Sequence, residues 1–312
     1  MVSVMGKRGL FLVWLCLVNI LPGMAQTEKL IDYVNPFVGT DGYGNVYPGA
    51  QIPFGGIQMS PDTDSKYYDA ASGYKYNHST LLGFSLTHLS GTGIPDLGDF
   101  LFIPGTGEMK LDPGTREEPE KGYRSRYSHE KEWASPNYYA VELSDYGVKA
   151  EMTSGVRSGM FRFTYPQSDK AFIMIDMNHT LWQSCEWANL RMENDSTITG
   201  YKLVKGWGPE RHIYFTATFS KKLTGLRFMQ NKKPVIYNTS RFRSSYEAWG
   251  KNLMACISFD TKAGEEVIVK TAISSVSTNG AKNNMAELAG LAFDELKAKG
   301  EALWEKELGK YT

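Results

Sequence analysis

The sequence predicts an all-β fold, a large antiparallel sandwich, with a helical segment at its C-terminal end. Two observations predict it. Runs of β-branched and aromatic residues at strand length recur between residues 138 and 275. After residue 278 the apolar residues follow three- and four-residue spacings, which are typical of an amphipathic helix. With 312 residues, the chain is long enough for one large β domain or two ordinary domains.

The N-terminus has the three parts of a secretory signal peptide. Lys7 and Arg8 give a positive start, residues 10–21 form an apolar run, and residues 23–25 place small side chains where signal peptidase reads them. We therefore expect residues 1–25 to be removed and the protein to be secreted or periplasmic. A membrane anchor is the alternative, but the run is shorter than the roughly 20 residues that a spanning helix needs.

The region 31–105 is rich in Gly and Pro and is typical of loops that join short strands. From residue 138 the strand signal is continuous, broken by turn-like pieces at 144–147, 166–170 and 261–266. Many strands at this spacing favour a large antiparallel sandwich. The strand-like runs are YYAVEL (138–143), MFRFTY (160–165), AFIMIDM (171–177), HIYFTATF (212–219), LMACISF (253–259) and EEVIVKTAIS (265–274).

The tail predicts a helix over residues 281–308, because its apolar residues lie three or four positions apart with Lys and Glu between them. We expect Asn279 or Asn283 to cap this helix and Gly300 to interrupt it. The apolar stripe must either fold back on the sheets or meet a partner, and we expect it to be exposed in this chain. Its members are Met285, Leu288, Ala292, Leu296, Leu303, Trp304 and Leu308.

Charge and composition narrow the range of partners. The 34 basic and 34 acidic residues give a formal net charge of zero, and no Lys/Arg run occurs, so we expect no nucleic-acid partner. The 18 Tyr and 7 Trp fit a β core or a sugar-binding cleft, and composition leaves both open. Signal cleavage leaves Cys185 and Cys256, which either pair in an oxidising compartment or stay as buried thiols. Their spacing predicts no zinc site.

Three long segments carry a family resemblance. They are YVNPFVGTDGYGNVYPGAQIPFGGIQMSPDT (33–63), SGYKY (72–76) with LLGFSLTHLSGTGIPDLGDFLFIP (81–104), and YRSRYSHEKEWASPNYYAVELSDYGVKAEMT (123–153). In content and order they resemble the N-terminal domain of glycoside hydrolase family 92, the calcium-dependent exo-acting α-mannosidases. The likeness extends through KGWG and the final WEKEL, so it covers nearly all of the mature chain.

The resemblance implies a β-supersandwich over residues 26–278 and a helical linker, residues 279–312, that leads toward an (α/α)6 barrel. In the family, the general acid, the general base and most calcium ligands lie on that barrel, in segments not found in this sequence. Inverting hydrolysis needs two carboxyls that flank the scissile bond. We therefore expect this chain to hold no catalytic residue and no calcium or other metal site, and to be inactive alone.

The implied partners are mannose-containing glycans and the barrel domain, encoded by the same gene or supplied by an adjacent chain. The function predicted from the resemblance is that of the N-terminal domain of a secreted α-mannosidase. The alternative is a self-standing carbohydrate-binding module without catalytic activity. The mannosidic linkage and the glycan source stay open.

This chain departs from the family pattern at three places. Leu86 stands where the family often has a histidine, and Tyr43 and Asn45 stand where it often has histidines in the Gly-rich loop. The tryptophan common just before the SGY segment is absent, and Tyr67 and Tyr68 lie there instead. These changes leave the predicted fold as it is and leave the sugar preference open.

The Gly-rich loop 39–49 is the first candidate binding segment. It lacks the GK[ST] ending of a phosphate-binding loop, and no helical pattern follows it. Tight turns explain its glycines. They do not explain the interleaved Tyr43, Asn45 and Tyr47, and the resemblance implies that this loop faces the sugar pocket.

A second candidate set surrounds the SGYKY turn, namely Tyr68, Asp69, Ser72 and Tyr74. We expect Tyr68 and Tyr74 to supply ring area for stacking on a sugar.

The run THLSGTGIPDLGD adds His88 and Asp96, which either orient sugar hydroxyls or bond to neighbouring backbone in turns. Both possibilities stay open for these two residues. For Asp99 we expect a structural role. A hydrolytic triad is not favoured, since no GxSxG elbow is present.

Overall fold

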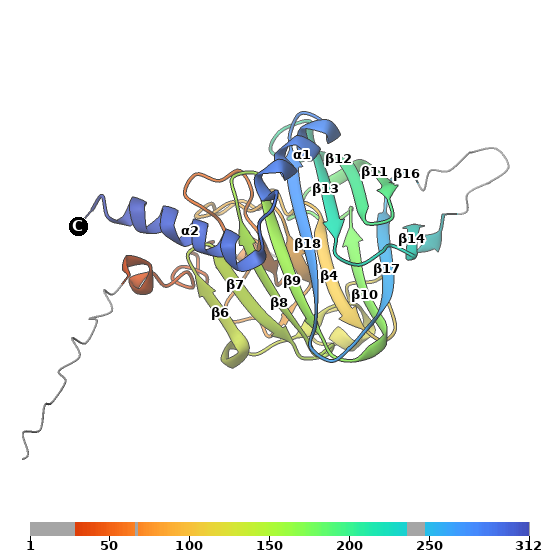
Figure 1. The fold of residues 1–312 in the computed structure, drawn as a ribbon, viewed down its shortest axis with the longest axis horizontal. Coiled ribbons are helices and arrows are strands. Elements are labelled where there is room, and N and C mark those ends of the chain that lie inside the picture. Colours follow the sequence, from red (N-terminus) through yellow and green to blue (C-terminus); the bar gives the residue numbers. More distant parts are fainter. Residues whose placement is uncertain (1–28, 66–67, 236–246, 312) are drawn as a thin grey trace, which may run out of the picture.

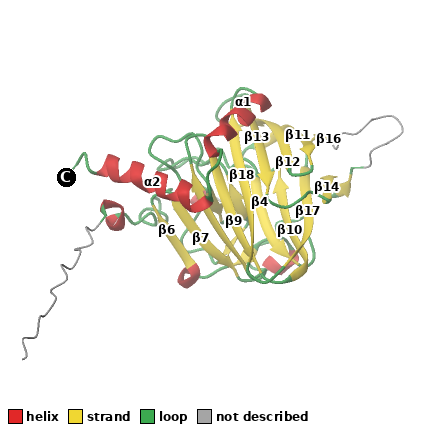
Figure 2. Cartoon of the chain, in the orientation of Figure 1, coloured by secondary structure: helices red, strands yellow, loops and turns green. Residues whose placement is uncertain are grey.

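The computed structural model describes residues 29–65, 68–235 and 247–311. The predicted signal peptide, residues 1–25, lies outside this part of the chain. No helix within it is long and apolar enough to cross a membrane. Two large antiparallel sheets stack as a sandwich, and the α-helices of the described residues come at the C-terminal end of the chain (Figures 1 and 2). The predicted all-β fold with a C-terminal helical segment is confirmed.

The smaller of the two sheets has seven strands and contributes one layer of the sandwich. In spatial order its strands are β1 (Ser60–Asp62), β3 (Gly83–Ser85), β4 (Leu101–Thr106), β10 (Ser168–Asp176), β17 (Leu253–Thr261), β14 (Gly225–Gln230) and β15 (Lys233–Pro234).

The larger sheet has nine strands and forms the second layer. In spatial order its strands are β16 (Glu247–Gly250), β11 (Ser184–Asn194), β12 (Thr197–Lys205), β13 (Arg211–Phe219), β18 (Glu265–Ser274), β9 (Ser158–Tyr165), β8 (Val148–Ser154), β7 (Tyr138–Leu143) and β6 (Glu132–Ser135). The short strands β2 (Thr80–Leu81) and β5 (Ser125–Arg126) pair separately. The 3-10 turns are η1 (Leu30–Tyr33), η2 (Tyr68–Ala70), η3 (Pro119–Lys121), η4 (His129–Lys131) and η5 (Met285–Leu288).

Strand β10 shows how the core is divided. Ile173 and Ile175 face the nine-stranded sheet and join the main core. Phe172 and Met174 point the other way, into a smaller core on the outer face of the seven-stranded sheet. Because side chains alternate along a strand, the next outward residue is Asp176. A carboxylate therefore lies at the end of an otherwise apolar row.

Five of the six strand-like runs in the sequence fall within observed strands, and the run 171–177 extends one residue beyond β10; two of them, 138–143 and 265–274, match strand bounds. Strands β11 and β12 were not among them. The β11–β12 register shifts at Cys185/Trp187 and again at Met192/Asn194. These irregularities disturb the two-residue alternation on which strand prediction depends. Cys185 and Cys256 are both buried free thiols, so they do not pair.

The structure corrects the predicted exposed stripe of the tail in part, because Leu288 and Leu296 are buried while Ala292 and Leu303 are exposed. The tail forms α1 (Thr278–Asn284), η5 and α2 (Phe293–Leu308), and it packs on the outer face of the nine-stranded sheet. Leu288 and Leu296 are buried against Met160 of β9. Trp304 is half-buried and donates its indole N–H to the Gln51 carbonyl at 2.8 Å. Ser277, rather than Asn279 or Asn283, caps α1.

Gly300 does not interrupt the helix, contrary to the prediction from sequence. It is buried inside α2, and a Cβ added there would overlap with the Asn137 side chain. Asn137 in turn bonds to Thr153 and Ser154 of β8. Glycine is therefore present because helix and sheet approach closely. The break in the helix falls instead between η5 and α2, where Gly290 has a φ of +70°.

Candidate functional site

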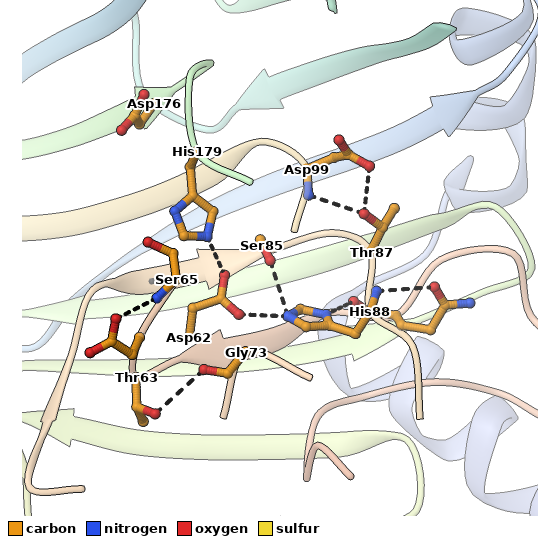
Figure 3. A network of polar contacts seen from close by, with 12 residues as sticks. Asp62, Thr63, Ser65, Gly73, Ser85, Thr87, His88, Asp99, Asp176 and His179 are labelled. Atoms are coloured by element: carbon orange, nitrogen blue, oxygen red, sulfur yellow. Dashed lines mark hydrogen bonds and ion pairs between the residues drawn. The ribbon is translucent and has the colours of Figure 1, made fainter. Parts of the chain in front are cut away.

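A buried carboxylate, Asp62, ends strand β1 and holds two histidines from distant parts of the chain (Figure 3). His88 Nε2 lies 2.7 Å from Asp62 Oδ1. His179 Nε2 lies 2.7 Å from Asp62 Oδ2. The Asp62 side chain has no exposed surface, so this cluster ties three chain segments together inside the protein.

The local sequence explains how the chain closes around Asp62. Gly73 has a φ of +88°, and a Cβ there would overlap with the Asp62 carboxylate. Only glycine meets both conditions. The Gly73 carbonyl then accepts from the Thr63 backbone N–H at 2.7 Å. The SGYKY turn is thereby closed over the carboxylate.

Hydrogen-bond geometry sets the protonation of His88. Its Nδ1 lies 2.8 Å from the Gln58 carbonyl oxygen, which can only accept, and its Nε2 faces the Asp62 carboxylate. Nδ1 therefore carries a proton, and Nε2 lies between the Asp62 carboxylate and the Ser85 hydroxyl, which is 3.0 Å away. Burial alone would raise the pKa of Asp62. The charge of His88 and hydrogen bonds from both histidines outweigh burial and hold that pKa well below its usual range.

A second fully buried carboxylate, Asp99, is held by permanent cations. Lys202 Nζ lies 3.0 Å from its Oδ1, and Arg211 donates to both oxygens at 2.6 and 3.1 Å. The Thr87 hydroxyl donates to it at 2.7 Å. Burial again opposes ionisation, but Lys202 and Arg211 outweigh it and keep the pKa of Asp99 well below its usual range. The structural role expected for Asp99 agrees with these contacts.

The two clusters are joined. Lys202 Nζ donates to the His179 backbone carbonyl at 2.6 Å, while the His179 ring binds Asp62. We call the joined set the buried network; its members are Asp62, His88, His179, Asp99, Lys202 and Arg211. It links the SGYKY turn and the THLSGTG loop to β12 and β13. Its two carboxylates have no exposed surface, so they act on the position of loops rather than on a substrate.

Three predicted site residues on loops reach the surface, and we call them the rim: Tyr43, Asn45 and Tyr68. Tyr43 is 94% exposed and Tyr68 is 53% exposed. Asn45 is half-buried, and its carbonyl accepts from the Gly91 N–H at 2.7 Å. That bond joins the Gly-rich loop to the THLSGTG loop. Tyr68 also meets Trp182 edge to face, with ring centroids 6.0 Å apart.

The other predicted site residues lie deeper. His88 is 3% exposed and belongs to the buried network, and Tyr47 packs its ring 5.1 Å from the His88 ring. Asp96 is buried and accepts from the Leu97 N–H. This is the backbone contact in a turn that the sequence analysis gave as one of two possibilities for Asp96. Ser72 is buried beside Gly73. The backbone of Asp69 lies in η2, and its side chain lies outside the described part of the structure.

Tyr74 is a core residue. It is 1% exposed, and its hydroxyl donates to buried Glu132 at 2.9 Å. Tyr139 and His129 bond to the same carboxylate. Burial, and the charge of Glu132 nearby, raise the pKa of Tyr74 far above its usual range. Its ring offers no face to a sugar, so the stacking role expected from sequence does not agree with its position.

Sequence reasoning missed Asp62, Lys202 and Arg211, and it assigned no function to His179. One signal was available for Lys202. It lies between Gly200 and Val204 in the inward phase of β12, where an apolar residue is the rule. A lysine at such a position predicts a buried acidic partner.

The sequence profile of the Glycosyl hydrolase family 92 N-terminal domain matches residues 33–274. The chain belongs to this family. Family 92 membership fits the sandwich and its packed helical tail, and it confirms the resemblance drawn from the three long segments.

Solved family 92 structures give the same architecture. The chain is 90% identical to a family 92 α-mannosidase from Bacteroides thetaiotaomicron, solved in complex with mannoimidazole. The match covers 91% of this chain and 37% of that one, with a TM-score of 0.89. A family 92 inverting mannosidase from the same species, at 24% identity and a TM-score of 0.75, shares the fold over 91% of this chain and 37% of its own.

A curated relative from Arthroderma benhamiae is described as an uncharacterized secreted glycosidase. It is 30% identical over 147 residues, which are 46% of this chain and 19% of that protein. This chain therefore spans a fifth to about two fifths of the relatives it matches.

The departures from the family 92 pattern fall partly in the core and partly in the rim. Leu86 is fully buried in the main core, and its N–H donates to the Asp99 carbonyl at 2.9 Å. Tyr43, Asn45 and Tyr68 belong to the rim. The rim changes are therefore the ones that reach the surface.

Proposed function

We propose that this chain is the sandwich domain of a secreted, exo-acting α-mannosidase and forms one wall of its sugar pocket. The observation that carries the proposal is the 90% identity to the Bacteroides thetaiotaomicron α-mannosidase over 91% of this chain. The signal-like N-terminus and the description of the Arthroderma relative as secreted support export, to the periplasm or the medium.

In this proposal the rim contacts mannose and the buried network positions the rim. Tyr43 and Tyr68 present ring faces that can stack on the apolar face of a pyranose. Asn45 offers an amide to sugar hydroxyls. His88 and Asp96 act indirectly, because each is buried and bonded to protein groups.

Catalysis by inversion requires two carboxyls, one to protonate the leaving oxygen and one to activate water. We place both on the (α/α)6 barrel that the family resemblance implies, and we expect this chain alone to be inactive. The calcium of the family goes to the same barrel. Within residues 29–65, 68–235 and 247–311, no group of three or more His, Cys, Asp or Glu is arranged to hold a metal. The residues present do not fit a calcium site by themselves.

The test joins this chain to the barrel domain of the 90%-identical relative and measures hydrolysis of an aryl α-mannoside. The isolated chain should show no turnover, and the joined protein should be active. Tyr68→Ala and Tyr43→Ala should each lower kcat/KM by roughly 5- to 150-fold without lowering the melting temperature. Trp249→Ala is the matched control for Tyr68→Ala, because Trp249 is an aromatic residue of similar exposure on the edge strand β16.

Three outcomes contradict the proposal. Turnover by the isolated chain would place catalytic groups within it. Rim variants as active as the Trp249 control would remove the sugar-wall role. A correctly folded joined protein that binds mannosides without hydrolysing them would favour the alternative of a non-catalytic binding module.

A further inference from the structure

A cavity of about 820 Å³ lies on the outer face of the seven-stranded sheet, away from the nine-stranded sheet. Its apolar lining comes from the smaller core, including Leu82, Tyr123 and Met254. Its polar lining comes from the segment after β10 and from two turns, at 231–232 and at Asn252. The volume is within the range of small-molecule sites. We call this cavity the outer pocket.

Asp176 is the charged group at the edge of the smaller core, and its hydrogen bonding is incomplete. Its Oδ1 accepts from the Asn178 backbone N–H at 2.8 Å. Its Oδ2 is 3.4 Å from the Tyr123 hydroxyl, at the long limit for a hydrogen bond. Among the ion pairs of the described residues, none includes Asp176. A half-buried carboxylate therefore lines the outer pocket, and its oxygens can accept further hydrogen bonds from a ligand.

Amide side chains surround this carboxylate. Asn178, Asn231 and Asn252 line the outer pocket, and Asn252 donates to Asn231 Oδ1 at 2.8 Å. That bond leaves one acceptor on Asn252 and the donors of Asn231 available. Gln183 donates to the Pro95 carbonyl at 2.8 Å, and its own Oε1 is buried with no protein partner in the described structure. Amides and a carboxylate together can donate to and accept from adjacent hydroxyls.

Trp182 supplies an aromatic wall. It is 57% exposed and lines the outer pocket, and its backbone φ of +66° is rare for a bulky residue. The strain is maintained by backbone bonds, one from the Trp182 N–H to the Ser65 carbonyl and one from the Leu181 N–H to the Leu97 carbonyl. An exposed indole held in a strained conformation is the kind of outlier that accompanies a ligand contact.

The charge of the outer pocket selects the class of ligand. Asp112 at the pocket edge is paired with Lys232, so Asp176 is the uncompensated charge, and it disfavours phosphates and other anions. A metal ion would need several oxygen ligands from the protein. The lining offers one half-buried carboxylate, amides and an indole. This combination matches an uncharged molecule with several hydroxyls and one apolar face.

We propose that the outer pocket binds a hexopyranose unit of a glycan, at a site that adjoins the rim through the contact between Trp182 and Tyr68. In it, Asp176 accepts from sugar hydroxyls, the Asn178 and Asn252 amides bond to neighbouring hydroxyls, and Trp182 stacks on the ring. The inference goes beyond the proposed function, because this site lies within the chain and needs no barrel.

The test titrates the full chain with methyl α-D-mannopyranoside and follows binding by ligand-observed NMR. We expect saturable binding with a Kd in the millimolar range, about −4 kcal/mol or weaker. Asp176→Asn should weaken it at least tenfold, since a bond to a charged acceptor is worth about that factor. Asn178→Ala should weaken it about threefold. Asn178 is exposed, so this variant decides the test if Asp176→Asn fails to fold.

Two control variants separate this site from others. Asp195→Asn removes an exposed carboxylate in a turn and should leave the Kd unchanged. Trp249→Ala removes an exposed indole on the edge strand β16, outside the lining of the outer pocket, and should also leave it unchanged. The proposal is overturned by an absence of saturable binding, by binding that Asp176→Asn and Asn178→Ala leave intact, or by binding that Trp249→Ala weakens as much as they do.

Discussion

The buried network and the outer pocket lie side by side and use carboxylates in opposite ways. In the buried network, both oxygens of Asp62 and of Asp99 accept short hydrogen bonds from protein groups. In the outer pocket, Asp176 has one backbone donor and a distant tyrosine hydroxyl. His179 belongs to both regions: its ring binds Asp62 and it also lines the outer pocket.

This difference distinguishes carboxylates that stabilise the fold from a carboxylate that can bind a ligand. A buried charge is tolerated only when it is paired and fully hydrogen-bonded, so the satisfied carboxylates of the buried network fix loop positions. A half-buried carboxylate keeps contact with solvent and can leave acceptor sites for a ligand. Burial with full pairing predicts a loss of stability on mutation, and incomplete pairing predicts a loss of binding instead.

The largest effect is expected from Asp99→Asn. This change leaves Lys202, which is fully buried, and Arg211 without a counter-charge. Arg211 keeps its charge, so that charge stays without a partner. Breaking a buried ion pair from one side costs about 3–5 kcal/mol, which urea denaturation would measure. Asp195→Asn, in an exposed pair with Lys222, should change stability by less than about 1 kcal/mol. A small effect at Asp99 would mean that the buried network does not hold the loops.

A smaller loss, about 1–2 kcal/mol, is expected from Asp62→Asn at neutral pH. Its partners are histidines. In the variant, the new amide N–H can donate to the neutral tautomer of His88 at Nε2, while the amide oxygen still accepts from His179. Comparing Asp62→Asn with Asp99→Asn therefore tests whether titratable partners soften the loss of a buried carboxylate. Equal losses would contradict this account.

The same variant has an expected pH dependence. The pKa of Asp62 is depressed in the folded protein. Its contribution to stability is therefore present above the unfolded pKa, about 3.9, and is lost as pH falls toward the folded value. The stability gap between wild type and Asp62→Asn should shrink as pH falls from 6 to about 3. A gap that stays constant or widens in acid would show that Asp62 is not ionised in the folded protein.

The sequence predicted the strands that carry dense runs of β-branched and aromatic residues, such as 138–143 and 265–274, because these residue types favour strands. It missed β11 and β12, where register shifts and inward polar residues hide that pattern. It also misplaced the break in the tail helix at Gly300. A glycine is needed there because the helix packs closely on Asn137, which lies 163 positions earlier in the chain. Local patterns do not encode such contacts.

The candidate site divides in the same way. Tyr43, Asn45 and Tyr68 were predicted and reach the surface, because turn-rich loops lie outside the core. Tyr74 was predicted from the same segment and is buried, because Glu132, from another strand, accepts its hydroxyl. The link from Asp62 to His179 joins residues 117 positions apart. No spacing rule predicts that pair.

At the border of the two regions, His179→Ala should cost about 1–3 kcal/mol, because Asp62 Oδ2 loses its donor inside the protein. His179→Gln restores an N–H donor and should recover part of that loss. The contact from Lys202 goes to the backbone carbonyl and is unchanged in both variants. Thermal unfolding checks this: the melting temperature should be highest for wild type, lower for His179→Gln and lowest for His179→Ala. If Gln is no better than Ala, the ring contributes packing rather than a hydrogen bond.

The smallest effect on stability is expected from Asp176→Asn. Its Oδ1 bond to the Asn178 N–H can be kept by the amide oxygen, and no cation in the described structure loses a partner. The contact with Tyr123 is too long to contribute much, so Tyr123→Phe should also be nearly neutral. We expect each variant to lie within about 1 kcal/mol of wild type in urea denaturation. A loss of 3 kcal/mol or more for Asp176→Asn would place this carboxylate with the buried network, and the contrast between the two regions would fail.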